Sequence, residues 1–226
     1  MFDPELNRTF TMRDSMDPIW WEGEPIWVTA AKNNIKSGIV FWPGSEVKIK
    51  GIRPNFYHPF SNSKTNQWRL DELFKFIDHP EQPRLLQAYF QTIDDMGHRH
   101  GPNSTEVQNE LKNADLVLEQ LLYGLEKRNL LNQFNIVITS DHGMTQTKKV
   151  IYMDDFVPNF LDRIDYYKWN PRGPYPFVSV NIEPRKPEDR PIILQELQKS
   201  KDMDCYDKTE FPEGWNMNNT GIFLII

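Results

Sequence analysis

The 226-residue chain has almost no cysteine and no long apolar run. Cys205 is the only cysteine, so no internal disulfide can form and the redox compartment cannot be inferred from it. No stretch of about 18 apolar residues could span a bilayer, and residues 1–30 lack the basic start and apolar stretch of a signal peptide. The sequence therefore predicts no transmembrane segment and no signal peptide in this chain.

Positive charge is outnumbered by negative charge, 26 Lys and Arg against 32 Asp and Glu, and is not concentrated anywhere. The net charge is −6 and the isoelectric point is near 5.4. Surfaces that hold nucleic acid carry clustered Lys and Arg, whereas here these residues are scattered without a stripe. A nucleic-acid polymer is therefore not expected as a partner. The apolar content of 38% is enough to build a core, so a disordered chain is not expected either.

Three tripeptides fit the N-x-[ST] pattern of N-glycosylation. The pattern is short, so chance occurrence in a polar chain and a glycoprotein remain open alternatives. The localisation is not decided by these tripeptides. They are Asn7-Arg8-Thr9, Asn103-Ser104-Thr105 and Asn218-Asn219-Thr220.

Apolar strand-like runs alternate with amphipathic helical runs, which favours an α/β fold. Leu85–Ile93 and Phe134–Ser140 are predicted to be buried strands. The intervening segment is predicted to be a helix packed on the sheet, with Asn103 or Ser104 as its N-cap. Such a crossover favours parallel strands, with functional groups gathered beyond their carboxyl ends. The apolar stripe of the helix is Val107, Leu111, Ala114, Leu118, Leu121, Leu122 and Leu125.

The outer parts of the chain are predicted in less detail. Residues 18–44 are rich in Trp, Pro and Gly and are interpreted as loops over a site, around short strands at 26–30 and 38–42. A strand is expected near 177–182, and a helix is expected from a cap at Asp189 to Leu197. The last six residues are predicted to be a strand. Such an ending indicates either a chain cut at both ends or an ordinary docked terminal strand.

Two carboxylate and imidazole pairs follow the two main predicted strands. Asp94 and His98 come after the first strand, and Asp141 and His142 come after the second. Carboxylate oxygen and neutral imidazole nitrogen suit zinc, and two such pairs suit a two-metal site for phosphoryl transfer. By themselves these residues could equally be turn caps and surface histidines. Their position after neighbouring strands favours metal binding.

Several motifs resemble the nucleotide pyrophosphatase/phosphodiesterase family of the alkaline phosphatase superfamily. The resemblance covers nearly the whole chain. It implies an alkaline-phosphatase-like α/β fold, a mostly parallel central sheet flanked by helices and incomplete at both ends. Residues 1–226 would then be the central portion of a single catalytic domain. The motifs are Asp94-x-x-Gly97-His98-x-x-Gly101-Pro102, Ile138–Met144, Trp21–Thr29, Phe41–Val47 and Phe211–Trp215.

The resemblance also implies a hydrolase of phosphodiester or pyrophosphate bonds with two zinc ions. Asp94 and His98 would be ligands of one zinc, and Asp141 and His142 would be ligands of the other. The family's Thr or Ser nucleophile and an Asp ligand lie upstream of the matched segment, and a further His lies downstream. Residues 143–226 contain no histidine. The alternative is a catalytically inactive relative with a binding or regulatory role, so an active enzyme is expected only where those segments exist.

The family acts on small phosphodiesters, either nucleotides or choline esters, outside the cell or tethered to the membrane. Three segments look more like the choline-specific glycerophosphodiesterase branch, namely Trp20-Trp21, Gly51-Ile52-Arg53-Pro54 and Ile93-Asp94 without a preceding Glu-Glu-Pro. Tyr89, Trp20 and Trp21 could offer aromatic faces to a quaternary ammonium, or they could be packing residues. Asp95, which departs from the family pattern, could be a solvated charge or could orient a ligand.

Overall fold

The computed structural model describes residues 2–3, 6–11, 14–149, 151–165, 179–207, 209–210, 214 and 222–225. These residues form two compact units, one of residues 15–146 and one of residues 1–14 and 147–226, and each is described by itself. Three predicted features lie wholly or mostly outside the described residues. They are the first part of the strand near 177–182, the motif at 211–215 and the tripeptide at 218–220.

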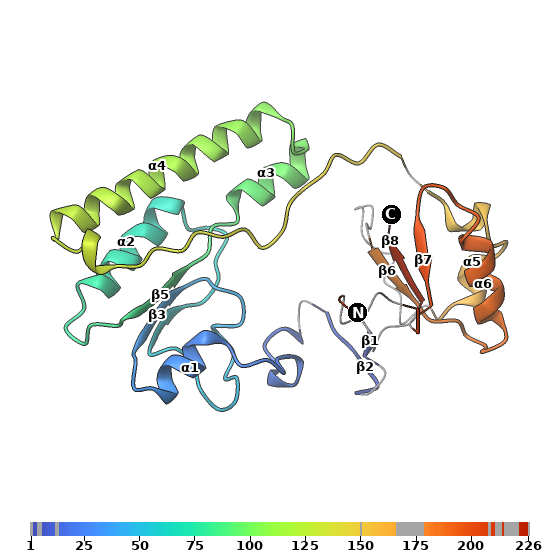
Figure 1. Ribbon diagram of the computed structural model, residues 1–226, viewed down its shortest axis with the longest axis horizontal. Helices are drawn as coiled ribbons and strands as arrows, with labels where there is room; N and C mark the ends of the chain where they lie inside the picture. The colour runs from blue at the N-terminus through green and yellow to red at the C-terminus, as the bar shows by residue number, and fades with distance from the viewer. Residues whose placement is uncertain are drawn as a thin grey trace. The chain divides into compact units, whose positions relative to one another are not determined.

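The unit of residues 15–146 is an α/β layer structure (Figure 1). Its sheet has three parallel strands in the order β4-β3-β5. Helices flank this sheet, so the predicted α/β fold with a parallel sheet is confirmed. The elements are η2 (Pro18–Trp20), α1 (Ile26–Lys32), β3 (Ser37–Val40), β4 (Phe56–His58), α2 (Asn66–Ile77), β5 (Leu85–Ala88), α3 (Thr92–His100), α4 (Thr105–Lys127) and η3 (Leu131–Gln133).

The central strand β3 is buried on both faces. Ile39 packs in a cluster with Trp27 of α1, and Val40 packs in another cluster with Phe76 of α2. The α2 helix lies so close to the strand that a Cβ atom on Gly38 would be 2.8 Å from the Phe76 ring. Helices α1 and α2 therefore cover opposite faces of the sheet (Figure 1). Because the helices cover the faces of the sheet, functional side chains are expected at the edge where the strands end.

The prediction of a strand at residues 26–30 is wrong, because these residues begin α1. Ile26, Val28 and Thr29 favour strands by propensity, but that preference yields to tertiary packing. Pro25 is the N-cap, and the consecutive residues Trp27 and Val28 pack in the cluster that contains Ile39 of the sheet. The strand expected at 38–42 is confirmed for its first residues in β3.

The two strands expected before the metal motifs also differ from the prediction. The first ends at Ala88, and Thr92 and Ile93 already belong to α3. The second, Phe134–Ser140, is an irregular extended segment in which Val137 is 86% exposed. Apolar β-branched residues only favour a pleated surface, whereas a strand requires a neighbour that completes its ladder. No described residue forms a ladder with this segment, so the predicted strand–helix–strand crossover is not formed.

Helix α4 begins as predicted, with Ser104 as its N-cap accepting a hydrogen bond from the Val107 amide at 3.3 Å. It packs on α2 and α3, instead of directly on the sheet as predicted. Its apolar stripe is consequently only partly covered, and Leu111 is 50% exposed. No helix among the described residues is long and apolar enough to cross a membrane.

The second unit contains a short hairpin and an antiparallel sheet ordered β6-β8-β7. The strand predicted near 177–182 is confirmed for its described part, and a strand near the end of the chain is confirmed as β8. Helix α6 ends at Leu197 as predicted, but its N-cap is Glu188 and Asp189 is its first residue. The elements are β1 (Phe2–Asp3), β2 (Arg8–Thr9), η4 (Met153–Asp155), α5 (Phe160–Arg163), β6 (Ser179–Ile182), α6 (Asp189–Leu197), β7 (Asp204–Tyr206) and β8 (Ile222–Ile225).

Candidate metal site

Helix α3 carries the first predicted pair of ligands. Asp94 lies in the first turn and His98 in the last, one helical turn apart, so both side chains lie on the same face. Asp94 Oδ1 is 3.4 Å from His98 Nε2. The pair that was predicted at a strand end is therefore built on one face of a helix that follows β5.

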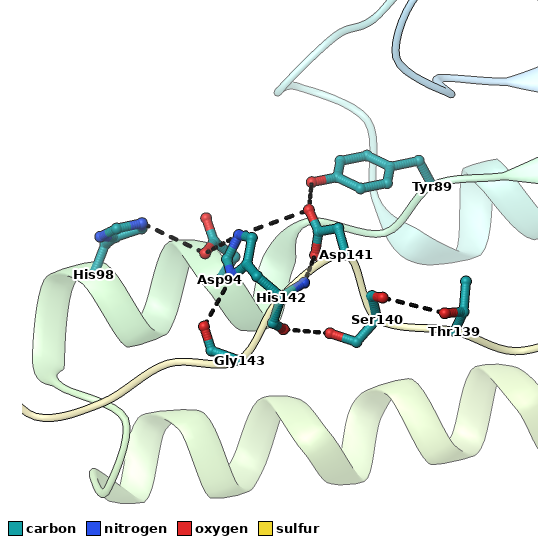
Figure 2. A network of polar contacts seen from close by, with 8 residues as sticks. All are labelled: Tyr89, Asp94, His98, Thr139, Ser140, Asp141, His142 and Gly143. Atoms are coloured by element: carbon teal, nitrogen blue, oxygen red, sulfur yellow. Dashed lines mark hydrogen bonds and ion pairs between the residues drawn. The ribbon is translucent and has the colours of Figure 1, made fainter. Parts of the chain in front are cut away.

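The second pair lies on the extended segment that runs alongside α3 (Figure 2). His142 Nε2 is 3.8 Å from Asp94 Oδ1 and 3.6 Å from Asp141 Oδ2. The structure thus brings all four predicted ligands together, with Asp94 as the residue that both histidines face (Figure 2). They meet even though the predicted second strand is absent.

Two glycines of the first motif explain why the segment can approach α3. A Cβ atom on Gly97 would be 2.3 Å from Met144 Sδ, and one on Gly101 would be 2.6 Å from Gln146 Oε1. Gly101 also has a φ of +86°, which favours glycine. The spacing Asp94-x-x-Gly97-His98-x-x-Gly101 therefore combines two ligands with the surface against which the other two dock.

The ring of His142 is oriented by a contact with the backbone of Gly143. Its Nδ1 is 2.9 Å from the carbonyl oxygen of Gly143, which can only accept a hydrogen bond, so Nδ1 carries the proton. The lone pair of neutral His142 is then on Nε2, which faces Asp94. The Gly143 carbonyl and then the carboxylate of Asp141 raise the pKa of His142.

The geometry around Asp94 fits a cation better than hydrogen bonding. Asp94 Oδ1 is a buried oxygen without a hydrogen-bond partner, and its separations of 3.4 and 3.8 Å from the two imidazoles exceed ordinary hydrogen-bond lengths. Two ligand atoms of a tetrahedral zinc with bonds near 2.0–2.1 Å lie about 3.3–3.4 Å apart. Among the described residues, no three His, Cys, Asp or Glu side chains converge on a single metal position. The 3.4 Å separation of Asp94 Oδ1 and His98 Nε2 matches that of two ligands on one zinc ion.

Tyr89 follows β5 and reaches the same site. Its hydroxyl donates to Asp141 Oδ2 at 3.4 Å (Figure 2). Burial, and then the negative charge of Asp141, raise the pKa of Tyr89, so the phenol remains a protonated donor near neutral pH. Tyr89 therefore contacts a predicted ligand through a long hydrogen bond, which the sequence did not indicate.

Trp21, one of the two tryptophans predicted to bind substrate, packs on the opposite face of the sheet from Tyr89. Trp21 packs against the cluster on the α1 face, and its Nε1 donates to the Ser15 carbonyl at 2.8 Å. Tyr89 packs against the cluster on the α2 face. Trp20 is the last residue of η2, in the segment that precedes Trp21. The structure therefore does not bring Trp21 and Tyr89 into one aromatic cage.

Sequence reasoning did not single out the polar residues under α3. Arg69 of α2 is completely buried, and Asn66 in the same helix bonds to both α3 and α4. The negative charge of Asp95 acts on Arg69 and opposes the lowering of the Arg69 pKa that burial causes. Asp95 lies in the first turn of α3, and both alternatives for it stay predictions. The feature of the sequence that could have identified these polar residues is a charged residue, Arg69, on the buried face of α2.

These features define an α/β protein with a carboxylate and imidazole site beside its parallel sheet. The family of type I phosphodiesterases and nucleotide pyrophosphatases matches residues 1–226, and the chain belongs to this family. Bovine ectonucleotide pyrophosphatase/phosphodiesterase family member 3 is 37% identical over 191 residues, which cover 82% of this chain. Venom phosphodiesterase 2 of Crotalus adamanteus is 35% identical over the same share of this chain.

The solved structure of murine ectonucleotide pyrophosphatase/phosphodiesterase 5 is also similar. It matches with a TM-score of 0.86 and 29% identity, covering 100% of this chain and 60% of that chain. A further matching structure is an inactive variant of the same murine protein in complex with AMP. The chain spans about a fifth of the length of the curated relatives, 21% for the bovine protein. The alkaline-phosphatase-like fold expected from the sequence is confirmed.

Proposed function

We propose that the whole protein hydrolyses phosphodiester or pyrophosphate bonds with two zinc ions, to which this chain contributes four ligands. Asp94 and His98 hold one ion, and Asp141 and His142 hold the other. The observation that carries the proposal is the buried Asp94 Oδ1, which has no hydrogen-bond partner and lies 3.4 Å from His98 Nε2 and 3.8 Å from His142 Nε2. Membership of the phosphodiesterase family supports the reaction type.

Zinc bound here would supply Lewis-acid charge at the phosphoryl oxygens. The residues of this chain would balance the charge of the ions and orient the ligands. The carboxylates of Asp94 and Asp141 balance the positive charge of the cations. Tyr89 orients Asp141 by its hydrogen bond, and the Gly143 carbonyl directs Nε2 of His142 toward Asp94.

The nucleophilic Thr or Ser and the remaining ligands are expected outside these 226 residues, as the resemblance implies. The activity is therefore proposed for the whole protein. The alternative is a catalytically inactive relative that retains the fold for binding. An extracellular or membrane-tethered location is proposed from the names of the relatives, which are ectonucleotide pyrophosphatases.

A nucleotide is the substrate best supported by the comparisons. Relatives 35–37% identical are named nucleotide pyrophosphatases, and one matching structure contains AMP. A choline phosphodiester was expected from the aromatic residues, but Trp21 and Tyr89 pack on opposite faces of the sheet. A choline ester is therefore the alternative substrate, to be compared with a nucleotide in assays on the whole protein.

Zinc titration of the 226-residue chain tests the site directly. We expect weak zinc binding, since two protein ligands per ion leave most positions to water. Asp94→Ala and Asp141→Ala should each weaken it by about tenfold or more. Asp115→Ala, on the exposed surface of α4, is the matched control and should bind as the unaltered chain does. Equal zinc binding by all four proteins would refute the assignment.

Hydrolysis assays on the whole protein distinguish a nucleotide substrate from a choline ester, and an active enzyme from an inactive relative. A nucleotide phosphodiester should be cleaved faster than glycerophosphocholine, with zinc present in both assays. Preference for glycerophosphocholine, lost in Tyr89→Ala, would instead support the choline proposal through cation–π contact. Zinc binding without hydrolysis of either ester would favour the inactive relative.

A further inference from the structure

Arg69 is a buried charge in the helix whose residue Asn66 contacts α3, the helix that carries Asp94 and His98. It lies on α2 and has no exposed surface. Its guanidinium carbon is 5.1 Å from the ring of Phe41 and 5.9 Å from the ring of Phe90, residues that follow β3 and β5. Burying a charge is costly unless it serves a compensating interaction, so this residue requires an explanation.

A polar chain leads from Arg69 to helices α3 and α4. Arg69 Nη1 donates to Asn66 Oδ1 at 2.9 Å. Because a guanidinium can only donate, the Asn66 oxygen must face Arg69 and its amide nitrogen must point the other way. That nitrogen donates to Thr92 Oγ1 at 3.0 Å and to Glu110 Oε1 at 3.2 Å. Arg69 thereby fixes the direction in which Asn66 bonds.

The contact with Thr92 matters because α3 is poorly held by its own sequence. The helix has nine residues, and its N-cap, Gln91, makes no side-chain capping bond. Helices this short are marginal in isolation, so tertiary contacts must place α3. Thr92 is its first residue, and Asp94 follows two residues later in the same turn. The hydrogen bond from Asn66 to Thr92 therefore acts on the turn that carries the carboxylate of Asp94.

We propose that Asn66 and Arg69 are positioning residues for the zinc site. They hold the first turn of α3 so that the carboxylate of Asp94 meets His98 and His142. The inference rests on the proposed function, because it assigns a supporting role at that site. The competing explanation is that these residues contribute to packing and stability alone, which would lower the melting temperature without a separate effect on zinc.

Two substitutions remove the hydrogen bond between Asn66 and Thr92, one from the donor side and one from the acceptor side, with little change in side-chain shape. Asn66→Asp keeps the acceptor for Arg69 but removes the amide donor to Thr92 and Glu110. Thr92→Val removes the acceptor hydroxyl, and Thr92→Ser, which keeps it, is the matched control. Zinc affinity of the 226-residue chain is measured by competition with a chromophoric chelator, below the melting temperature of each variant. Thermal unfolding of the zinc-free proteins is measured in parallel.

Asn66→Asp and Thr92→Val are each expected to weaken zinc binding about tenfold, while Thr92→Ser changes it by less than about twofold. Should Asn66→Asp fail to fold, the Thr92 pair decides. Unchanged zinc affinity in Thr92→Val, with Asp94→Ala still losing zinc, would overturn the positioning role and leave the site intact. No zinc binding by the unaltered chain would overturn the proposed site and this inference with it.

Discussion

At the scale of single residues, the candidate site depends on the close approach of α3 to the segment that carries Asp141 and His142, as well as on the ligands themselves. Gly97 is a helical residue between Asp94 and His98, and Met144 packs directly over it. Any side chain at position 97 must displace the segment that carries Asp141 and His142. The glycine of the motif is therefore explained by sterics at the contact between the two ligand pairs, and this explanation can be tested.

Gly97→Ala should weaken zinc binding by about tenfold, because its Cβ would lie 2.3 Å from Met144 Sδ and move the segment away. Adding Met144→Ala should restore most of the affinity, since the space is then free. Gly143→Ala is the control, because a Cβ there meets nothing within 4 Å. Zinc titration of the four proteins provides the measurement. Equal losses in Gly97→Ala and the double variant would contradict the steric explanation.

A second residue-scale prediction concerns acid stability in the other unit. Arg190 Nε lies 2.7 Å from Asp207 Oδ2, and this ion pair is the main cause that lowers the pKa of Asp207 from 3.8 to about 2. Because the folded pKa lies below the unfolded value, the pair stabilises the protein above about pH 4, and this stability is lost as the pH falls through about 2.

Arg190→Met should therefore lower the free energy of unfolding by about 1 kcal/mol at neutral pH, with the difference shrinking between about pH 4 and 2. Urea unfolding across this pH range measures it. Lys199→Met, which breaks an exposed pair with Glu196, should have little effect at any pH. A loss in Arg190→Met that is the same at every pH would show that lost packing, not the ion pair, is responsible.

At the scale of elements, the sequence predicted helices with clear caps and periodicity, and it missed elements that depend on partners. Ser104 and the apolar stripe after it correctly predicted α4. The stripe could not reveal that α4 packs on two helices, because a stripe shows only that one face is covered. Residues 26–30 were assigned by propensity to a strand, and packing makes them helical.

The candidate ligands were predicted more successfully than the elements that carry them. Asp94, His98, Asp141 and His142 do lie together, although one pair is on a helix and the other on an unpaired segment. Motif spacing fixes the ligand types and the glycines around them. The supporting residues Asn66 and Arg69 are distant in sequence from both motifs, and only the three-dimensional contacts identify them.

The N-cap of α4 gives a prediction at this scale. Ser104→Ala should lower the free energy of unfolding by about 1 kcal/mol, because the Val107 amide loses its acceptor. Ser104→Asp should retain the cap and most of the stability. Chemical denaturation of both variants is the measurement, and equal losses would show that the hydroxyl does not act as a cap.

At the scale of the whole molecule, the chain divides into two compact units. Asp94, His98, Asp141, His142 and Tyr89 all lie in the unit of residues 15–146. The other unit has its own sheet and its own cluster of apolar residues, including Phe160 and Ile193. The proposed chemistry of this chain therefore resides in one unit, and the second contributes none of the four ligands.

A fragment of residues 15–146 should accordingly fold and bind zinc with an affinity within about threefold of the full chain, since each ligand and its supporting residues remain. Circular dichroism tests the fold, and competition titration tests zinc binding. The same fragment with Asp94→Ala should bind no better than Asp94→Ala in the full chain, which excludes adventitious sites created by truncation. A folded fragment that had lost zinc binding would show that residues 147–226 help to form the site, and the assignment of the site to one unit would then be wrong.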